Sequence, residues 1–205
     1  MGVITISVLD LQVGASADDV RHYILISNGS HGFDTTFQLL SGNTTVVKGT
    51  GAGMRFTSVT IAQGSTWDVA YLTLTANAGY SGATCIAVID AEDVDTGTAP
   101  TSDADYDDEV KTTATAPWNP IPAAVLDTAY NTPSIIAVGQ EITDRAGWAS
   151  GGALQFFLHD DAQASSSGAY RTWYSYDQST TKAPKLHIES SAGGGAVFVP
   201  TLMVI

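Results

Sequence analysis

Residues 134–158 read SIIAVGQEITDRAGWASGGALQFFL, and this stretch passes from a helical pattern through a Gly-rich turn into an apolar run. Ile135, Val138 and Ile142 recur at the spacing of one helix face, which predicts a short amphipathic helix. The apolar run after the turn has the length and composition of a buried strand. The stretch therefore predicts one short helix placed among strands.

The limits of this helix follow from its flanking residues. Thr132 is expected to cap it, Pro133 suits its first helical position, and Gly147 is expected to end it. Glu141 and Arg145 are four residues apart, a spacing that predicts a structural ion pair on the helix surface.

The composition favours β structure in the rest of the chain. The 205 residues suit one main domain, of which 44% are apolar and only 14% charged, with 20 glycines. Thr, Val, Ile and Tyr recur throughout, whereas the residues that fill exposed helices are scarce. An all-β chain is the expected class.

Short apolar or alternating segments separated by turn residues predict about ten strands. Two of them, 37–40 and 44–47, flank Ser41-Gly42-Asn43 and predict a hairpin. With one helix, this pattern predicts a sandwich of two antiparallel sheets. The expected strands are 3–9, 22–26, 37–40, 44–47, 51–61, 66–76, 85–89, 154–158, 170–176 and 184–189.

Three regions are expected along the chain: an N-terminal strand or arm over 1–15, the sandwich over 16–189, and a Gly-rich hinge with an apolar tail over 190–205. An apolar tail exposed to water is unfavourable, so it either completes the domain's own sheet or docks on a neighbouring subunit. The candidate subunit-contact residues are Val197, Phe198, Leu202, Met203 and Ile205.

Charge and hydropathy exclude several classes of protein. The formal net charge of −13 opposes binding to nucleic acid and to anionic membrane surfaces. No apolar run approaches the roughly 20 residues that span a bilayer, and the first residues alternate like a strand rather than a signal peptide. The single cysteine, Cys85, lies in an apolar segment and is expected to pack as a small hydrophobe.

Residues 90–109 are strongly acidic and predict a long solvated loop. Asp103, Asp105 and Asp107 alternate like the opening of a calcium loop. However, Asp108 stands where such a loop needs glycine, and Ala114 where it needs a bidentate glutamate. This segment therefore either binds a structural calcium ion, the sole cofactor that the sequence suggests, or is a solvated loop without a bound ion.

An enzymatic role is not expected. The four histidines, His22, His31, His159 and His187, show no metal-ligand spacing, so a metal held through histidine is not expected either. His159 is followed by two aspartates, but no Ser or Cys stands in a nucleophile-elbow context beside it. A glycosidase, the least favoured class, would need a pair of facing carboxylates.

The aromatic side chains have two interpretations, because flat rings pack both in cores and against sugars. Trp118 lies in a Pro-rich segment and is expected to be the most exposed ring, whereas Trp148 is expected to close one end of the sandwich. The candidate sugar-binding residues are Trp118, Trp173 and Tyr176.

Several motifs, in one order, resemble a family of bacterial and phage surface modules. They are an Asp-Asp opening, an Arg-Phe strand with a Gln-Gly turn, a Gln-Glu-Ile helix and a closing strand, at residues 16–19, 54–65, 140–148, and 174–177 with 183–189. The resemblance covers about residues 16–189. It implies a jelly-roll β-sandwich similar to carbohydrate-binding modules, without catalytic activity, found in extracellular multidomain proteins and in virions.

The expected function is that of a non-enzymatic virion structural protein, a capsid decoration or fibre-type protein, because a virion protein needs no export signal. Its expected partners are other capsid or tail proteins and two further copies of itself, since repetition gains avidity. The alternative is an extracellular carbohydrate-binding or adhesion module that recognises a surface glycan.

Overall fold

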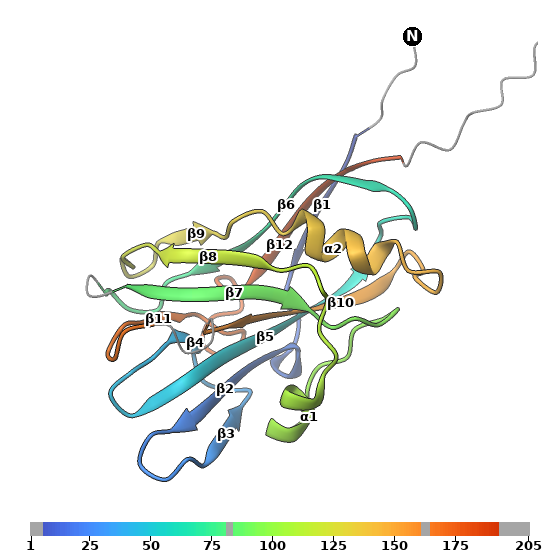
Figure 1. Cartoon of the computed structure of the whole chain (residues 1–205). Helices are drawn as coiled ribbons and strands as arrows, with labels where there is room; N and C mark the ends of the chain where they lie inside the picture. The colour runs from blue at the N-terminus through green and yellow to red at the C-terminus, as the bar shows by residue number, and fades with distance from the viewer. Residues whose placement is uncertain (1–5, 81–83, 161–164, 193–205) are drawn as a thin grey trace, which may run out of the picture.

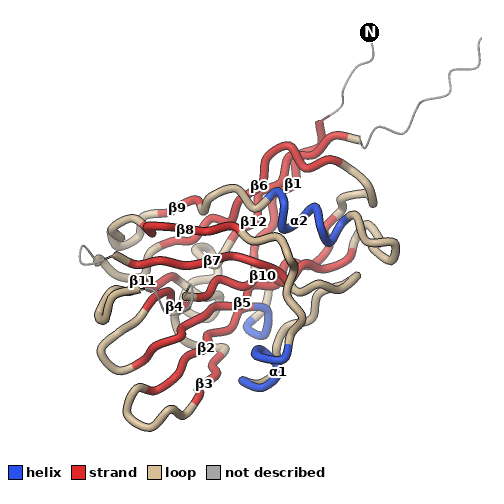
Figure 2. The backbone as a smooth tube through the Cα atoms, viewed as in Figure 1, coloured by secondary structure: helices blue, strands red, loops and turns tan. Residues whose placement is uncertain are grey.

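The computed structural model describes residues 6–80, 84–160 and 165–192 (Figure 1). Strands dominate it, with two short α-helices and one 3-10 turn (Figure 2). In chain order the elements are β1 Ile6–Gln12, η1 Ser16–Asp18, β2 Asp19–Leu25, β3 His31–Asp34, β4 Leu39–Gly42, β5 Val47–Val59, β6 Thr66–Thr75, β7 Cys85–Ala91, α1 Asp103–Asp108, β8 Ala116–Ile121, β9 Ala129–Asn131, α2 Ile136–Thr143, β10 Gly152–His159, β11 Tyr170–Trp173 and β12 Lys185–Ser191.

Two main sheets stack to form a β-sandwich. One sheet has the strand order β3-β2-β5-β10-β7-β8, the other has the order β1-β12-β6-β9, and β11 and β4 form a separate two-stranded sheet. Every pairing of named strands is antiparallel. The expected all-β sandwich is confirmed, and α1 and the small third sheet are additions to it.

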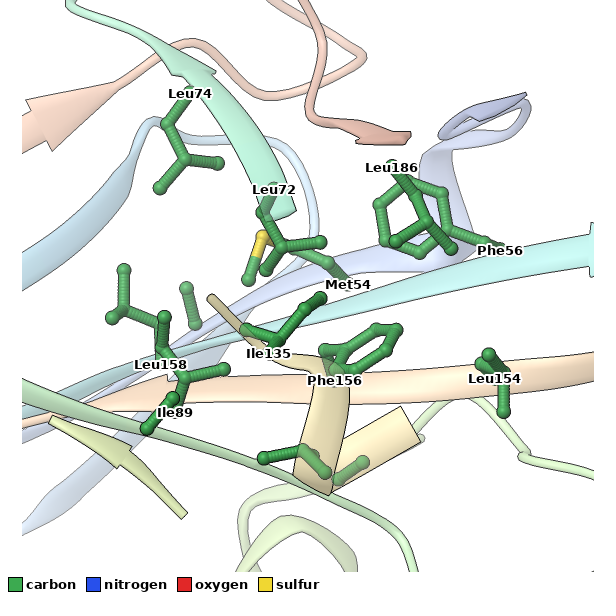
Figure 3. Packing of buried hydrophobic residues seen from close by; sticks show 14 of the residues in the cluster. Met54, Phe56, Leu72, Leu74, Ile89, Ile135, Leu154, Phe156, Leu158 and Leu186 are labelled. Atoms are coloured by element: carbon green, nitrogen blue, oxygen red, sulfur yellow. The ribbon is translucent and has the colours of Figure 1, made fainter. Parts of the chain in front are cut away.

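The core lies between the two main sheets, where inward-facing side chains of both interdigitate (Figure 3). Phe56 on β5 and Phe156 on β10 meet edge to face, with ring centroids 6.2 Å apart. Helix α2 packs against β6 so closely that a Cβ on Gly139 would lie 2.2 Å from the Trp67 ring. Glycine is therefore required at this helix–sheet contact.

Helix α2 presents the expected apolar face, since Ile135, Val138 and Ile142 are all buried. Its start differs from the prediction: the helix begins at Ile136, and Thr132 is not its cap. The Thr132 hydroxyl instead accepts a hydrogen bond from the Leu72 backbone and donates one to the Pro133 carbonyl. The Thr132 side chain is therefore used in a tertiary hydrogen bond to β6 rather than in capping the helix.

The predicted hairpin of 37–40 with 44–47 does not form. β4 pairs with β11, while β5 pairs with β2 and β10. Between β4 and β5 the chain turns on Thr44, whose hydroxyl accepts from the backbone amides of Val46 and Val47. The turn sends the two strands into different sheets.

Strand β1, within the region 1–15 that was expected to form a strand or arm, pairs into the four-stranded sheet of the sandwich. It pairs with β12 from Ile6 opposite Ser191 to Gln12 opposite Lys185. The described ends of the chain therefore lie side by side at one edge of the four-stranded sheet (Figure 1). The apolar tail, with its candidate subunit contacts, lies outside the described residues. Neither α-helix in the described ranges has the length and apolar character needed to cross a bilayer.

Candidate functional site

A hollow of about 560 Å³ opens beside the small β4–β11 sheet, at the end of the sandwich where β2 ends and β5 begins. Its walls carry three tyrosines from three separate segments together with Arg21 and Gln38. We call this feature the tyrosine groove and define it by Arg21, Tyr23, Gln38, Tyr80 and Tyr170.

The backbone around the tyrosine groove sets the positions of its rings. Tyr23 lies directly over Gly32 of the neighbouring strand β3, where a Cβ would come within 2.3 Å of the ring. Tyr80 and Tyr170 pack against each other with ring centroids 4.1 Å apart. The Arg21 guanidinium lies 4.9 Å from the centroid of the Tyr23 ring. Half-buried aromatic faces are thus held in place before any ligand arrives.

The groove differs in charge from the rest of this acidic chain. Arg21 is its single charged lining residue, and its buried Nε has no hydrogen-bond partner among the described residues. A guanidinium with an unused donor suits a carboxylate or sulfate group, and tyrosine faces suit the C–H surfaces of sugar rings. The groove can therefore accept a neutral or anionic ring-bearing ligand.

A second constellation joins two histidines and two aspartates from three elements. We call it the His/Asp cluster: His22 on β2, His31 on β3, and Asp103 and Asp107 on α1. One potential ligand atom from each residue lies within 4.8 Å of all the others. His22 is buried, whereas the other three side chains are partly or fully exposed.

The acidic segment is partly helical rather than a continuous loop, and this changes the calcium prediction. Ser102 caps α1 by accepting from the Asp105 backbone amide. The helix places Asp103 and Asp107 on one face, toward the histidines, while the Asp105 carboxylate accepts from the backbone and hydroxyl of Thr101. The three candidate calcium ligands therefore do not converge on one point.

The aromatic residues predicted to bind sugar lie elsewhere. Trp118 and Trp173 are both buried in the core and stack on each other, with ring centroids 5.7 Å apart, so neither offers a face to a ligand. Proline residues beside Trp118 suggested an irregular loop, but the segment forms β8 and turns the ring inward. Tyr176 is half-buried and packs against the core. Trp148 is buried, and its Nε1 donates to the Ile61 carbonyl.

The predicted Glu141–Arg145 pair is replaced by two separate interactions. Glu141 accepts hydrogen bonds from the backbone amides of residues 113 and 114, which lead into β8. Arg145 instead binds Asp93 and Asp95. Both side chains fasten α2 and its following turn to the loops beside them.

Two side chains that could be chemically reactive, those of His159 and Cys85, make structural contacts instead. His159 Nε2 lies 2.8 Å from a carboxylate oxygen of Asp90. Cys85 is buried as expected, and burial raises the pKa of its thiol to about 11. The thiol therefore stays protonated and packs as an apolar group.

The outer face of the four-stranded sheet carries exposed apolar side chains. Ile6, Val8 and Val69 are 55%, 60% and 36% exposed, and we call them the outward strip. The pairing register places Glu189 between Val8 and Val69 on adjacent strands. β1 pairs with β12 alone among the described strands, so its other edge is free within them.

No protein-family model matches the chain, and no curated protein matches it.

Proposed function

We propose that the protein is a non-enzymatic structural protein of a virus particle, of the decoration or fibre type, that assembles through the outward strip and the edge of β1. The observation that carries this proposal is the position of the strip. Its apolar side chains lie beside the point where both described chain ends leave the sheet.

The physical argument rests on the edge strand. An edge strand presents unpaired N–H and C=O groups, and proteins that remain monomeric usually protect such edges with charges, prolines or bulges. β1 instead carries Ile6 and Val8 outward, with Asp10 further along the same face. Burying these side chains against a neighbouring subunit removes apolar area from water and pairs the free edge.

We propose other copies of this chain as the neighbours, in a trimer that contacts capsid or tail proteins. Symmetric repetition gives a weakly binding domain avidity on a particle surface. The net charge of −13 favours solubility of the displayed domains and argues against nucleic acid as the partner.

The direct test is the composition of particles purified from cells that carry the gene. We expect this chain in many copies per particle, with antibody against the sandwich labelling the particle exterior in electron micrographs. Particles that contain no such chain, with the protein found free in the lysate, would contradict the proposal.

A second candidate function, carbohydrate binding, is favoured by the tyrosine groove. The strands β2, β4 and β11, which contribute residues to the groove, lie away from the described chain ends (Figure 1), so a domain anchored at those ends would present the groove outward. Its tyrosine faces and the Arg21 guanidinium suit a glycan that carries acidic groups. The test is a glycan array with the wild-type chain and Tyr170→Ala, with Tyr71→Ala on the opposite sheet as the matched control. Binding lost only in Tyr170→Ala supports this function, and an array without any bound glycan opposes it.

A further inference from the structure

We propose that the His/Asp cluster binds one divalent transition-metal ion, of which zinc fits best, and that this ion fastens helix α1 to the edge of the six-stranded sheet. The ligands are His22 Nε2, His31 Nδ1 and one carboxylate oxygen each from Asp103 and Asp107.

The spacing of the ligand atoms carries the proposal. His31 Nδ1 lies 3.2 Å from Asp103 Oδ2 and 3.3 Å from Asp107 Oδ2, and His22 Nε2 lies 2.8 Å and 3.5 Å from Oδ1 of the same two aspartates. Four ligands at the usual zinc distances of about 2.0–2.1 Å in a tetrahedron are about 3.3–3.4 Å apart. The two histidines face different oxygens of each carboxylate, so a set with one oxygen per aspartate contains two of these four distances. With Oδ2 of both aspartates they are 3.2 Å and 3.3 Å, close to the tetrahedral edge. The widest spacing in the set, 4.8 Å, requires the side chains to draw in around the ion.

A second, independent observation is the state of His22. The residue is only 5% exposed, yet its Nε2 has no hydrogen-bond partner of acceptable geometry among the described residues. Asp103 Oδ1, which faces it, is unsatisfied in the same way. The two atoms are in contact at 2.8 Å without a well-formed hydrogen bond. Buried polar atoms left in this way are costly, and an ion bound to His22 Nε2 would satisfy that nitrogen.

The surroundings hold the His22 ring in position for ligation. Tyr106, on α1 between the two aspartates, stacks on the imidazole with ring centroids 4.7 Å apart and an interplanar angle of 8°. Tyr106 in turn meets Phe157 edge to face at 5.1 Å. The imidazole is thus clamped by side chains that belong to a buried cluster.

The type of ligand selects the class of metal. Two imidazole nitrogens with two carboxylates suit zinc and neighbouring transition metals, and the two carboxylates neutralise the ion's charge. Calcium prefers six to eight oxygen ligands, but Asp105, which lies between the two aspartates along α1, is directed to Thr101 instead. The proposed site therefore differs from the calcium loop expected from the acidic sequence.

The ion would stabilise two elements that have little support of their own. β3 has four residues at the edge of its sheet, and α1 has six. Isolated helices of this length are marginal in water. α1 lies beside β3 at this edge (Figure 1), and a metal shared between them would couple their folding to metal binding.

The test uses the full-length chain without a polyhistidine tag, stripped of metal with a chelator and titrated with zinc by calorimetry. We expect one zinc ion per chain and a rise in Tm on zinc addition, with no comparable rise on calcium addition. Cobalt(II) in the same site should give the intense visible absorption of a four-coordinate ion.

The informative variants replace the exposed ligands, because these can change without opening the core. The His31 and Asp107 side chains are 41% and 44% exposed. His31→Ala and Asp107→Asn should each weaken zinc binding by more than the roughly 10–100-fold typical of losing an outer-shell partner, and the double variant should show no zinc-dependent Tm. His187→Ala, which removes a histidine that pairs with carboxylates on the opposite sheet, is the control and should bind zinc like the wild type. Absence of zinc uptake by the wild type, or equal uptake by the folded double variant, would overturn the proposal.

Discussion

The indole rings of Trp118 and Trp173 stack in the buried core, with centroids 5.7 Å apart and planes 15° from parallel. The two rings come from strands β8 and β11, which lie in different sheets. Trp173 also donates from Nε1 to the Ser41 hydroxyl on β4. The Trp173 side chain therefore ties β11 to β4 within the small sheet through its hydrogen bond, and joins this sheet to β8 through its stacking on Trp118.

Replacement of Trp173 by alanine is expected to destabilise the fold by about 3–5 kcal/mol, because it opens a large cavity and leaves the buried Ser41 hydroxyl without this donor. Urea unfolding followed by circular dichroism measures the free energy of unfolding, with the exposed Val125→Ala as the control. A loss below about 1 kcal/mol would mean that this ring is not part of the packed core.

The stability of the protein should fall as the pH rises, because of Asp19. Burial raises the pKa of this carboxyl to about 7 from its ordinary value of 3.8, although its Oδ2 accepts a hydrogen bond from the Tyr176 amide. A group with a raised pKa in the folded state favours folding fully only below its unfolded pKa, and this contribution is lost as the pH rises through about 7.

Between pH 5 and pH 8 this one carboxyl should cost roughly 2–3 kcal/mol of unfolding free energy. Asp19→Asn keeps an acceptor for Tyr176 and should remove most of that pH dependence, whereas the exposed Asp68→Asn should keep it. Urea unfolding curves at pH 5 and pH 8 provide the comparison. An unchanged pH dependence in Asp19→Asn would refute the assignment.

If the tyrosine groove binds acidic glycans, Arg21 should determine their recognition. Arg21→Gln removes the groove's single cation and should weaken binding of uronic-acid oligosaccharides by at least about 10-fold, since hydrogen bonds to charged groups contribute about 1.5–3 kcal/mol. Binding of uncharged oligosaccharides should change little. Calorimetric titration of both glycan types measures this, with Lys185→Gln on the far sheet as the control. Equal weakening for both types would assign Arg21 a role in packing only.

Much of the fold could be predicted from the sequence because it follows from the pattern of apolar and polar residues within single segments. The all-β class, most of the expected strands and the buried helix face at Ile135, Val138 and Ile142 are confirmed. The errors arise where tertiary contacts override a local preference. Thr132 bonds to β6 rather than capping α2, and Trp118 turns inward from a segment whose prolines suggested a loop.

The candidate sites were harder to predict because their parts are distant in the sequence. The His/Asp cluster joins β2 and β3 to α1, more than 70 positions apart, and the tyrosine groove collects rings from three separate segments. One local signal was present: Asp103 and Asp107 are four residues apart, the spacing of one helix face. Interpreting residues 90–109 as a loop concealed it. Neither histidine carried a comparable signal, since strand pairing alone brings them together.

The central claim, assembly through the outward strip, is tested most directly by the mass of the full-length chain in solution. Sedimentation velocity of the wild type should give a trimer. Val8→Lys places a cation opposite Glu189, which supports the β1–β12 pairing while disrupting the apolar strip, and should give a folded monomer. Val125→Lys, an equally exposed valine outside the strip, should leave the trimer intact. A wild-type monomer, or a Val8→Lys trimer as stable as the wild type, would contradict the account.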